Sequence, residues 1–184
     1  NAREVRMILR QGLVKVDGRK RADPKFPAGF MDVITIPKTG ESFRIMYDSK
    51  GLFELVKVGE AEASTKLCRV NNVYTTTGRT PMLTTHDGRR IRFPDPKIAR
   101  GDSIAVNTAT GKITEILKAR PGKIAMITGG ANRGLVGEIV SIERHPGSFD
   151  IARLKDQAGN ELATRNENVF VLAGSFDKIS ISMP

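Results

Sequence analysis

The stretch that decides the fold is KIAMITGGANRGLVGEIVSI, residues 123–142. It predicts two apolar strands, over 123–128 and 135–142, joined by the glycine-rich loop 129–134. Three more short strands are expected over 149–154, 161–164 and 169–172. Five short strands in so little chain are typical of a small closed barrel, because closure hides the strand edges.

The chain before this stretch is also punctuated into short strands. Residues 39–118 contain strand-like segments separated by turn signals such as Asp87-Gly88 and Thr110-Gly111-Lys112. Strands spaced about ten residues apart indicate a barrel or a sandwich. We therefore expect a central β domain over residues 39–118.

The first residues predict a different unit, a helix followed by a hairpin. Residues 3–11 read as a short helix with Val5, Ile8 and Leu9 on one face. Asp17-Gly18 predicts a tight turn between strands, and 31–36 returns as a strand. A helix this short is marginal alone, so its apolar face is expected to need a packing surface.

Composition points to a polyanionic partner. The 184 residues include 30 Lys and Arg against 20 Asp and Glu, a formal charge of +10, and the sequence pI is near 10.0. Nucleic acid is the usual partner of so basic a chain, and a merely solubilising surface is the alternative. With no Trp and few other aromatic residues, contact with phosphates and shape is favoured over base stacking.

Several function classes find no support in the residues. One cysteine, Cys68, excludes an internal disulfide and a multi-cysteine zinc site. No apolar run reaches the roughly 18 residues of a membrane span, and no secretion segment opens the chain. These features favour a reducing cytosol or nucleus.

Catalytic and cofactor motifs are equally sparse. His86 and His145 lie at predicted turns far apart in sequence. We expect Cys68 to pack as a small apolar group. The alternative is that the two histidines and Cys68 converge in space. Loop 129–134 lacks the Gly-Lys-Ser/Thr ending of a nucleotide-binding loop and is followed by a strand. We expect no catalytic residue, no metal, no cofactor and no small-molecule substrate.

Basic side chains gather in three places that suit contact with RNA phosphates. They are the polar face of the first helix, the strands around the Asp17-Gly18 turn, and the strand after Asp87-Gly88, where Arg90 and Arg92 share one face. Loop 129–134 carries Asn132 and Arg133, which could meet the RNA backbone. The alternative is that this loop only connects two strands. The predicted RNA-binding residues are Arg3, Arg6, Arg10, Lys15, Arg19, Lys20, Arg21, Arg89, Arg90, Arg92, Asn132 and Arg133.

Several segments together resemble a known family. Residues 12–18 with Pro24 and Pro27 resemble the C-terminal part of a small RNA-binding domain, and residues 123–149 resemble the KOW motif. With PAGFMDVI at 27–34, THDGR at 85–89, RFPDP at 92–96 and HPGSFD at 145–150, the pattern resembles the eukaryotic and archaeal family of small-subunit ribosomal protein four. The resemblance runs over nearly the whole chain.

The resemblance implies a mainly β protein in successive parts. They are a partial RNA-binding domain at 1–38 that keeps only a helix and a hairpin, the central β domain at 39–118, a five-stranded KOW barrel at 119–173 and a C-terminal tail at 174–184. The first domain is expected to lack its N-terminal helices.

The resemblance also implies a function without catalysis. The protein would be a structural constituent of the small ribosomal subunit that binds and stabilises ribosomal RNA. Its partners would be that RNA and neighbouring ribosomal proteins, on cytoplasmic ribosomes, with nucleolar assembly if the source is eukaryotic. The alternatives are an RNA-modifying enzyme and a factor that visits the ribosome or a polymerase.

Overall fold

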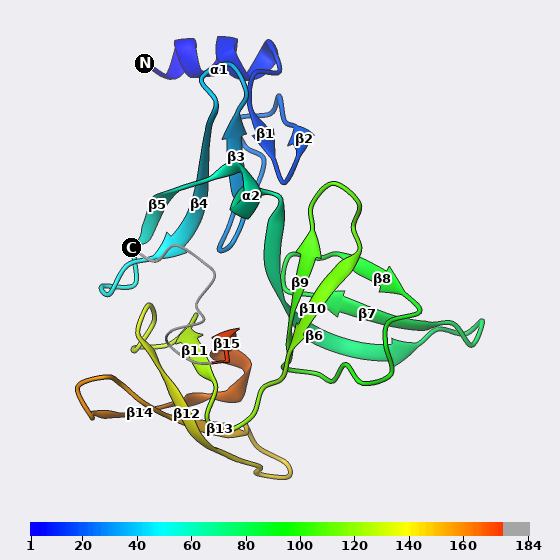
Figure 1. The fold of residues 1–184 in the computed structure, drawn as a ribbon, viewed down its shortest axis with the longest axis vertical. Coiled ribbons are helices and arrows are strands. Elements are labelled where there is room, and N and C mark those ends of the chain that lie inside the picture. The colour runs from blue at the N-terminus through cyan, green and yellow to red at the C-terminus, as the bar shows by residue number, and fades with distance from the viewer. Residues whose placement is uncertain (175–184) are drawn as a thin grey trace.

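The computed structural model of the chain describes residues 1–174. Within that range the protein is mainly β, with three antiparallel five-stranded sheets and short helices (Figure 1). This confirms the mainly β class and the short N-terminal helix that the sequence predicts. The predicted C-terminal tail, 174–184, lies outside the described residues except for Gly174.

The first sheet has the strand order β2-β1-β3-β4-β5. Its strands are β1 (Lys15–Val16), β2 (Arg19–Lys20), β3 (Val33–Ile36), β4 (Glu41–Tyr47) and β5 (Phe53–Val58). The predicted Asp17-Gly18 turn is confirmed, because it joins β1 to β2 with both residues at positive φ, 49° and 76°. The predicted boundary at residue 38 falls between β3 and β4, which pair with each other.

The second sheet has the order β10-β9-β6-β7-β8. The short helix α2 (Glu60–Ala63) leads into it. Its strands are β6 (Thr65–Thr75), β7 (Pro81–Thr85), β8 (Arg90–Arg92), β9 (Ser103–Asn107) and β10 (Ile113–Leu117). The predicted turns at Asp87-Gly88 and Thr110-Gly111-Lys112 connect β7 to β8 and β9 to β10.

The third sheet has the order β14-β13-β12-β11-β15. Its elements are β11 (Ile124–Ile127), β12 (Val136–Glu143), β13 (Ile151–Lys155), β14 (Glu161–Arg165), the 3₁₀ turn η1 (Asn166–Asn168) and β15 (Val169–Ala173). All five predicted strands are present. The edge strands β14 and β15 are not paired with each other in this sheet, so the five strands are an open sheet as far as pairing shows.

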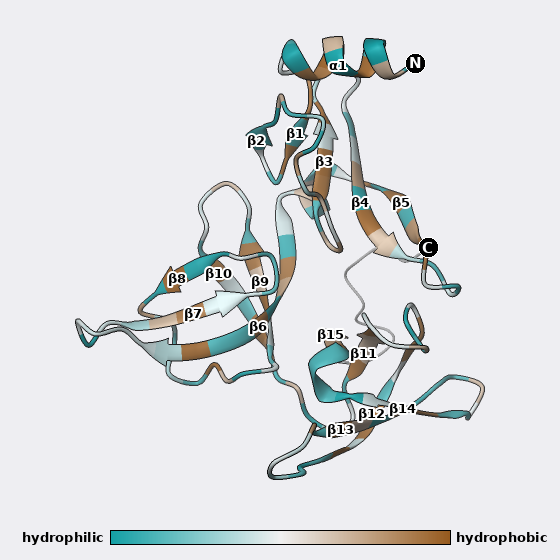
Figure 2. Cartoon of the chain, turned by 180° about the vertical axis from the view of Figure 1, so that it is seen from behind, coloured by the Kyte–Doolittle hydropathy of each residue, from teal (hydrophilic) through white to brown (hydrophobic). Residues whose placement is uncertain are grey.

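One apolar cluster joins the three sheets. Phe30, Met31 and Met46 come from the first sheet and the loop before β3, and they pack against a set from the other two sheets: Leu67, Ala105, Met126, Phe170 and Leu172. Figure 2 shows apolar segments on β4, β9 and β15, and each of these strands contributes side chains to the cluster. The second and third sheets also have apolar cores of their own. The three sheets therefore pack against each other through a shared apolar cluster.

Helix α1 (Ala2–Arg10) confirms the predicted helix to within a residue. Asn1 caps it by accepting hydrogen bonds from the backbone N–H groups of Arg3 and Glu4. The helix lies across one end of the first sheet (Figure 1), and none of its residues is buried. Its predicted apolar face is largely uncovered within residues 1–174, with Val5 52% and Ile8 43% exposed.

Neither α-helix in the described part of the chain has the length and apolar character needed to cross a membrane.

Candidate nucleic-acid interface

Strand β6 places buried charges on two sides of the second sheet. Side chains alternate along a strand, so Lys66, Cys68 and Val70 share one face while Leu67 and Arg69 share the other. All five are buried. Lys66 faces the first sheet and Arg69 faces the third, which makes β6 the strand that supplies a cation to each junction.

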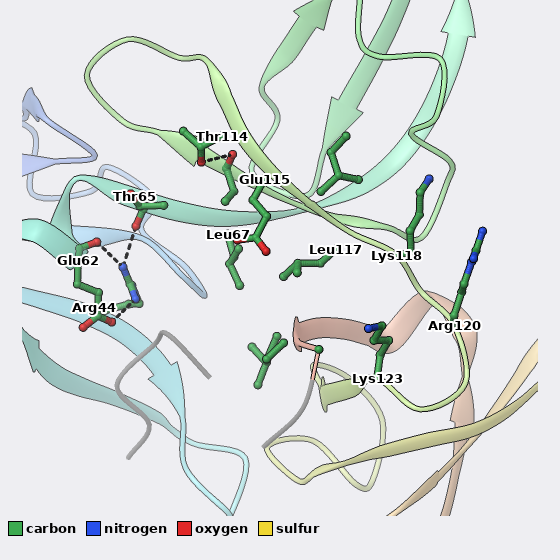
Figure 3. Close-up of a pocket in the computed structure, with 15 residues that line it drawn as sticks. Arg44, Glu62, Thr65, Leu67, Thr114, Glu115, Leu117, Lys118, Arg120 and Lys123 are labelled. Atoms are coloured by element: carbon green, nitrogen blue, oxygen red, sulfur yellow. Dashed lines mark hydrogen bonds and ion pairs between the residues drawn. The ribbon is translucent and has the colours of Figure 1, made fainter. Parts of the chain in front are cut away.

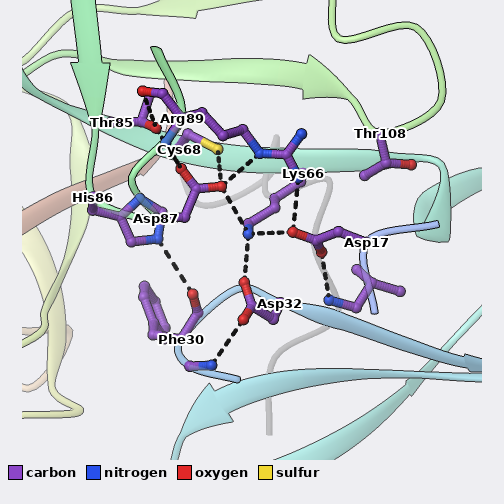
Figure 4. Close-up of polar contacts among 12 residues, drawn as sticks. Asp17, Phe30, Asp32, Lys66, Cys68, Thr85, His86, Asp87, Arg89 and Thr108 are labelled. Atoms are coloured by element: carbon purple, nitrogen blue, oxygen red, sulfur yellow. Dashed lines mark hydrogen bonds and ion pairs between the residues drawn. The ribbon is translucent and has the colours of Figure 1, made fainter. Parts of the chain in front are cut away.

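The Lys66 ammonium lies at the centre of a network of five charged groups (Figure 4). It is 2.7 Å from Asp17 and 3.0 Å from Asp87, and it also pairs with Asp32. Arg89 closes the network, at 2.8 Å from Asp17 and 2.7 Å from Asp87. Three carboxylates and two cations from four separate segments are thus brought together.

Local backbone geometry aims these carboxylates inward. Asp17 occupies the left-handed turn position of the β1–β2 hairpin, and its Oδ1 also accepts the backbone N–H of Val33 at 3.1 Å. Asp32 accepts the N–H of Gly29 at 2.8 Å. Asp87 accepts a hydrogen bond from the Thr85 hydroxyl. Asp32 and Asp87 are therefore held by their own turns as well as by the cations, and Asp17 is held by the neighbouring strand β3.

The network keeps Lys66 and Asp87 charged. Burial alone would lower the pKa of Lys66, but the three carboxylates outweigh burial and raise it. Burial alone would raise the pKa of Asp87, but Lys66, Thr85 and Arg89 outweigh it and hold that pKa well below its usual range. Removing one member of such a buried network leaves an uncompensated charge inside the protein, which lowers the stability of the fold.

Cys68 packs in the apolar core of the second sheet, as expected, and it also converges with His86, but not with His145, beside this network. Possible ligand atoms of Cys68, His86 and Asp87 lie within 4.8 Å of one another. However, His86 Nδ1 accepts the backbone N–H of Arg69 at 3.2 Å, and Nε2 lies 3.3 Å from the Phe30 carbonyl oxygen, which it can reach as a donor.

Their surroundings favour neutral, structural side chains over metal ligands. Burial lowers the pKa of His86. Burial and the Asp87 charge raise the pKa of the Cys68 thiol, whereas a metal-binding cysteine must be deprotonated. The Lys66 ammonium already neutralises Asp87. The convergence was missed because β6 and the β7–β8 turn are adjacent only in the folded sheet.

The structure brings four of the predicted RNA-binding residues to one groove. Arg19 and Arg21 from the first hairpin and Arg89 and Arg90 from the β7–β8 turn line a cavity of about 790 Å³. The charged network forms its floor, because Asp17, Lys66 and Asp87 line it too. Arg21 packs over the Phe26 ring at 4.0 Å, and its buried Nε has no hydrogen-bond partner within the described residues.

The other predicted residues lie elsewhere. Arg3, Arg6 and Arg10 are exposed on α1, Lys15 is half-buried on β1, Lys20 is exposed on β2, and Arg92 is exposed on β8. None of these six forms an ion pair within residues 1–174. Arg89 differs from all of them, because both of its ion pairs are with the internal network.

The glycine-rich loop 129–134 lies against the β4–β5 turn. A Cβ on Gly134, whose φ is +92°, would meet the Asp48 carbonyl oxygen at 2.0 Å. Arg133 lies over the Tyr47 ring at 5.2 Å, and the amide of Asn132 donates to the Ala163 carbonyl at 3.4 Å. The close approach that the glycines permit is therefore to another turn of this chain, while Arg133 itself remains exposed.

A second cavity, of about 860 Å³, lies where the three sheets meet (Figure 3). Arg44 lies in its wall and is held by Glu62 at 2.6 Å and by the Thr65 carbonyl at 2.8 Å. Lys118, Arg120 and Lys123, in and beside the segment that links β10 to β11, form its other side, and Leu67, Leu117 and Leu172 add apolar surface. The buried Arg44 thus has its charge matched inside the protein.

Sequence reasoning missed the buried charges that organise these junctions. Lys66, Asp17, Asp32 and Asp87 were not singled out, and neither was Arg69. The signal that was available is the pattern of β6, where two cations stand within an otherwise apolar run, KLCRV at 66–70. A charge in a strand that is buried on both faces needs a partner or a ligand.

Family models match three successive segments of the chain. The S4 domain model matches residues 1–34, the model described as ribosomal family S4e matches 39–113, and the KOW motif model matches 121–155.

Relatives that match nearly the whole of this chain agree with these family models. Proteins named small ribosomal subunit protein eS4 from Spodoptera frugiperda and Bombyx mori are each 52% identical over 181 residues, covering 98% of this chain and 68% of the relative. The crystal structure of the 30S ribosomal protein S4e from Thermoplasma acidophilum is similar in fold, with a TM-score of 0.80 and 39% identity. It covers 95% of this chain and 87% of that one.

Proposed function

The chain belongs to the S4e family of ribosomal proteins, and from that membership we propose that it binds small-subunit ribosomal RNA through basic side chains spread over its three sheets. It is a structural constituent of the small ribosomal subunit that serves translation, and it is not an enzyme. This decides against an RNA-modifying enzyme and against a factor that only visits the ribosome.

The observation that carries the RNA-binding proposal is the groove lined by Arg19, Arg21, Arg89 and Arg90. Residues about 70 positions apart in sequence meet there. Arg19 and Arg90 are exposed and have no ion-pair partner in the described chain. Arg21, which packs over the Phe26 ring, adds a further positive charge to the lining of the groove. Phosphate oxygens are the acceptors that arginine's planar fork suits best.

The proposed mechanism is electrostatic. Lysine and arginine side chains replace the counterions along the phosphates, and the entropy of counterion release favours binding. The predicted contact residues are the twelve given above, of which Arg21, Arg89, Asn132 and Arg133 also make contacts within the protein. These four are proposed to hold the neighbouring groups in place as well as to meet RNA.

Salt titration tests the mechanism. If roughly six or more phosphates are neutralised, affinity for RNA extracted from small subunits falls by orders of magnitude between low and moderate salt. The variant Arg19→Gln/Arg90→Gln should bind more weakly and show a smaller salt slope. The control, Lys38→Gln/Lys112→Gln, removes the same charge from two exposed turn residues. A salt response that is flat for the unaltered chain contradicts the proposal.

We also propose that the third sheet acts as a partly open barrel. Its edge strands β14 and β15 are joined by the three-residue turn η1, which spans only about 6 Å at the rise of a 3₁₀ helix. The edges must therefore approach each other at that end. This approach of the two edges at one end supports the barrel proposed from the KOW resemblance.

The ribosomal constituent resides on ribosomes in the cytoplasm, and we propose that it also contacts neighbouring ribosomal proteins. Nucleolar assembly is proposed on the premise of a eukaryotic source. The insect relatives, at 52% identity, support that premise better than the archaeal structure at 39%.

A further inference from the structure

A basic pocket lies between the second and third sheets, away from the predicted RNA-binding residues. Its volume is about 570 Å³. The cations that line it come from both sheets and from the segment between them: Arg69, Arg100, Lys118, Arg120, Arg144 and Arg165. Sequence reasoning placed none of these six in a site, because they are spread over about 100 residues of chain.

Arg69 is the buried member of the set, with 7% of its surface exposed. Its Nε donates to the Val169 carbonyl at 2.8 Å, and one terminal nitrogen donates to the Asn166 carbonyl at 3.1 Å. These partners are neutral, and no ion pair to Arg69 forms within residues 1–174. Burial lowers the pKa of Arg69, and the charge of Arg100 lowers it further.

Within residues 1–174, the carboxylates of the pocket pair with only two of its cations, Lys118 and Arg165. Asp102 pairs with Lys118 at 2.8 Å and accepts the backbone N–H groups of residues 99 and 119. Asp150 accepts the backbone N–H of residue 145. Glu167 lies 3.6 Å from Arg165. Six cations therefore face three carboxylates, and Arg100, Arg120 and Arg144 have no ion-pair partner in the described chain.

The pocket is also partly preorganised. The Arg165 guanidinium lies 3.8 Å from the centre of the Phe149 ring, and such stacking fixes its orientation. Arg69 is held by its two carbonyl partners. Fixed cations lose less conformational entropy when a ligand arrives.

We propose that this pocket receives backbone phosphates of the bound RNA, which makes it a second RNA contact that links the two sheets. The inference rests on the proposed function and adds a specific site to it. Phosphate is favoured over an acidic protein side chain for a geometric reason. A single carboxylate delivers one charge, whereas successive phosphates of a strand can reach cations on both sheets. Binding there would fix the orientation of the third sheet relative to the second.

The test compares the full chain with Arg100→Gln/Arg144→Gln, both exposed positions where substitution leaves the fold intact. Affinity for RNA extracted from small subunits should fall roughly tenfold or more, and the slope of log affinity against log salt should become shallower by about one to two. The matched control is Lys38→Gln/Lys112→Gln, which should change both quantities less.

The outcomes separate this inference from the proposed function. If the unaltered chain binds RNA with a steep salt slope but the pocket variant binds identically, the pocket is not an RNA site and the function stands. If the unaltered chain fails to bind RNA, the proposed function itself fails. If RNA affinity is unchanged while uptake into reconstituted subunits falls, an acidic segment of a neighbouring protein occupies the pocket and the inference is overturned.

Discussion

Lys66 and Arg69 stand three residues apart on β6, are both buried, and have opposite surroundings. Lys66 meets three carboxylates at the junction of the first and second sheets. Arg69 meets two backbone carbonyls and the side chain of Asn71 at the junction of the second and third sheets, where Arg100 repels its charge more strongly than Glu167 attracts it. One buried cation is neutralised inside the protein and the other is not.

The difference teaches how a basic protein divides its charges between folding and binding. A buried cation with carboxylate partners belongs to the fold, because removing either side leaves an unpaired buried charge. A buried cation with only neutral partners, next to further unpaired cations, is stabilised when a polyanion arrives. Net charge alone does not separate the two roles.

The largest expected effect is on the neutralised junction. Lys66→Met leaves Asp17, Asp32 and Asp87 close together without their central cation. We expect a loss of about 3–5 kcal/mol in the free energy of unfolding, measured by denaturant titration. Lys57→Met is the control, since Lys57 pairs with Glu41 at the surface and should change stability by less than about 1 kcal/mol. Equal effects of the two substitutions would break the comparison.

Acid should weaken the same junction through Asp87. Its folded pKa lies below the unfolded value of about 3.9. Its contribution is therefore fully present above that value and is lost as the pH falls through the folded pKa. Asp87→Asn should flatten the loss of stability below about pH 4.

Neutral His86 provides an internal reference for that measurement. Its folded pKa is lowered by burial, so its contribution is lost as the pH falls below the unfolded value of about 6.5. This loss should persist in Asp87→Asn and extend to lower pH, because the Asp87 charge raises the pKa of His86 in the unaltered protein. Unfolding curves at a series of pH values check both parts, and an unaltered curve below pH 4 in the variant would contradict the role given to Asp87.

Neighbouring arginines sharpen the comparison on a smaller scale. Arg89→Ala should lower stability by about 1–2 kcal/mol, because it removes two ion pairs of the network.

Arg90→Ala/Arg92→Ala should change stability by less than about 0.5 kcal/mol and weaken RNA binding, because both side chains are exposed. Thermal melting measures the stability of each variant, and titration with RNA measures its affinity. A large loss of melting temperature in the double variant would show that Arg90 and Arg92 support the fold.

The smallest expected effect has the opposite sign. Arg100→Gln removes a charge that repels the buried Arg69, so the free protein should gain up to about 0.5 kcal/mol in stability. Denaturant unfolding without RNA measures it. A loss of stability instead would show that Arg100 supports the fold, and the second junction would no longer differ in kind from the first.

Much of the fold was predictable because its signals are local. Positive φ at the Asp17-Gly18 turn, the five strands after residue 123 and the helix near the start all follow from short-range patterns. The sequence pointed to residues of the candidate groove only where exposed charge is the whole requirement, as for Arg19 and Arg90. It did not point to Arg69 or Lys66, whose roles depend on residues up to 100 positions away.

The sequence by itself determined the strands, the turns and the excess of positive charge, since these follow from the order and type of neighbouring residues. Only the tertiary structure decided which charges are used within the protein. Lys66 and Arg69 have the same sign and neighbouring places on one strand, but alternation directs them to opposite faces. The first sheet brings carboxylates to one face, while the third brings carbonyls and more arginines to the other. That assignment depends on how the three sheets pack, and a linear pattern does not contain it.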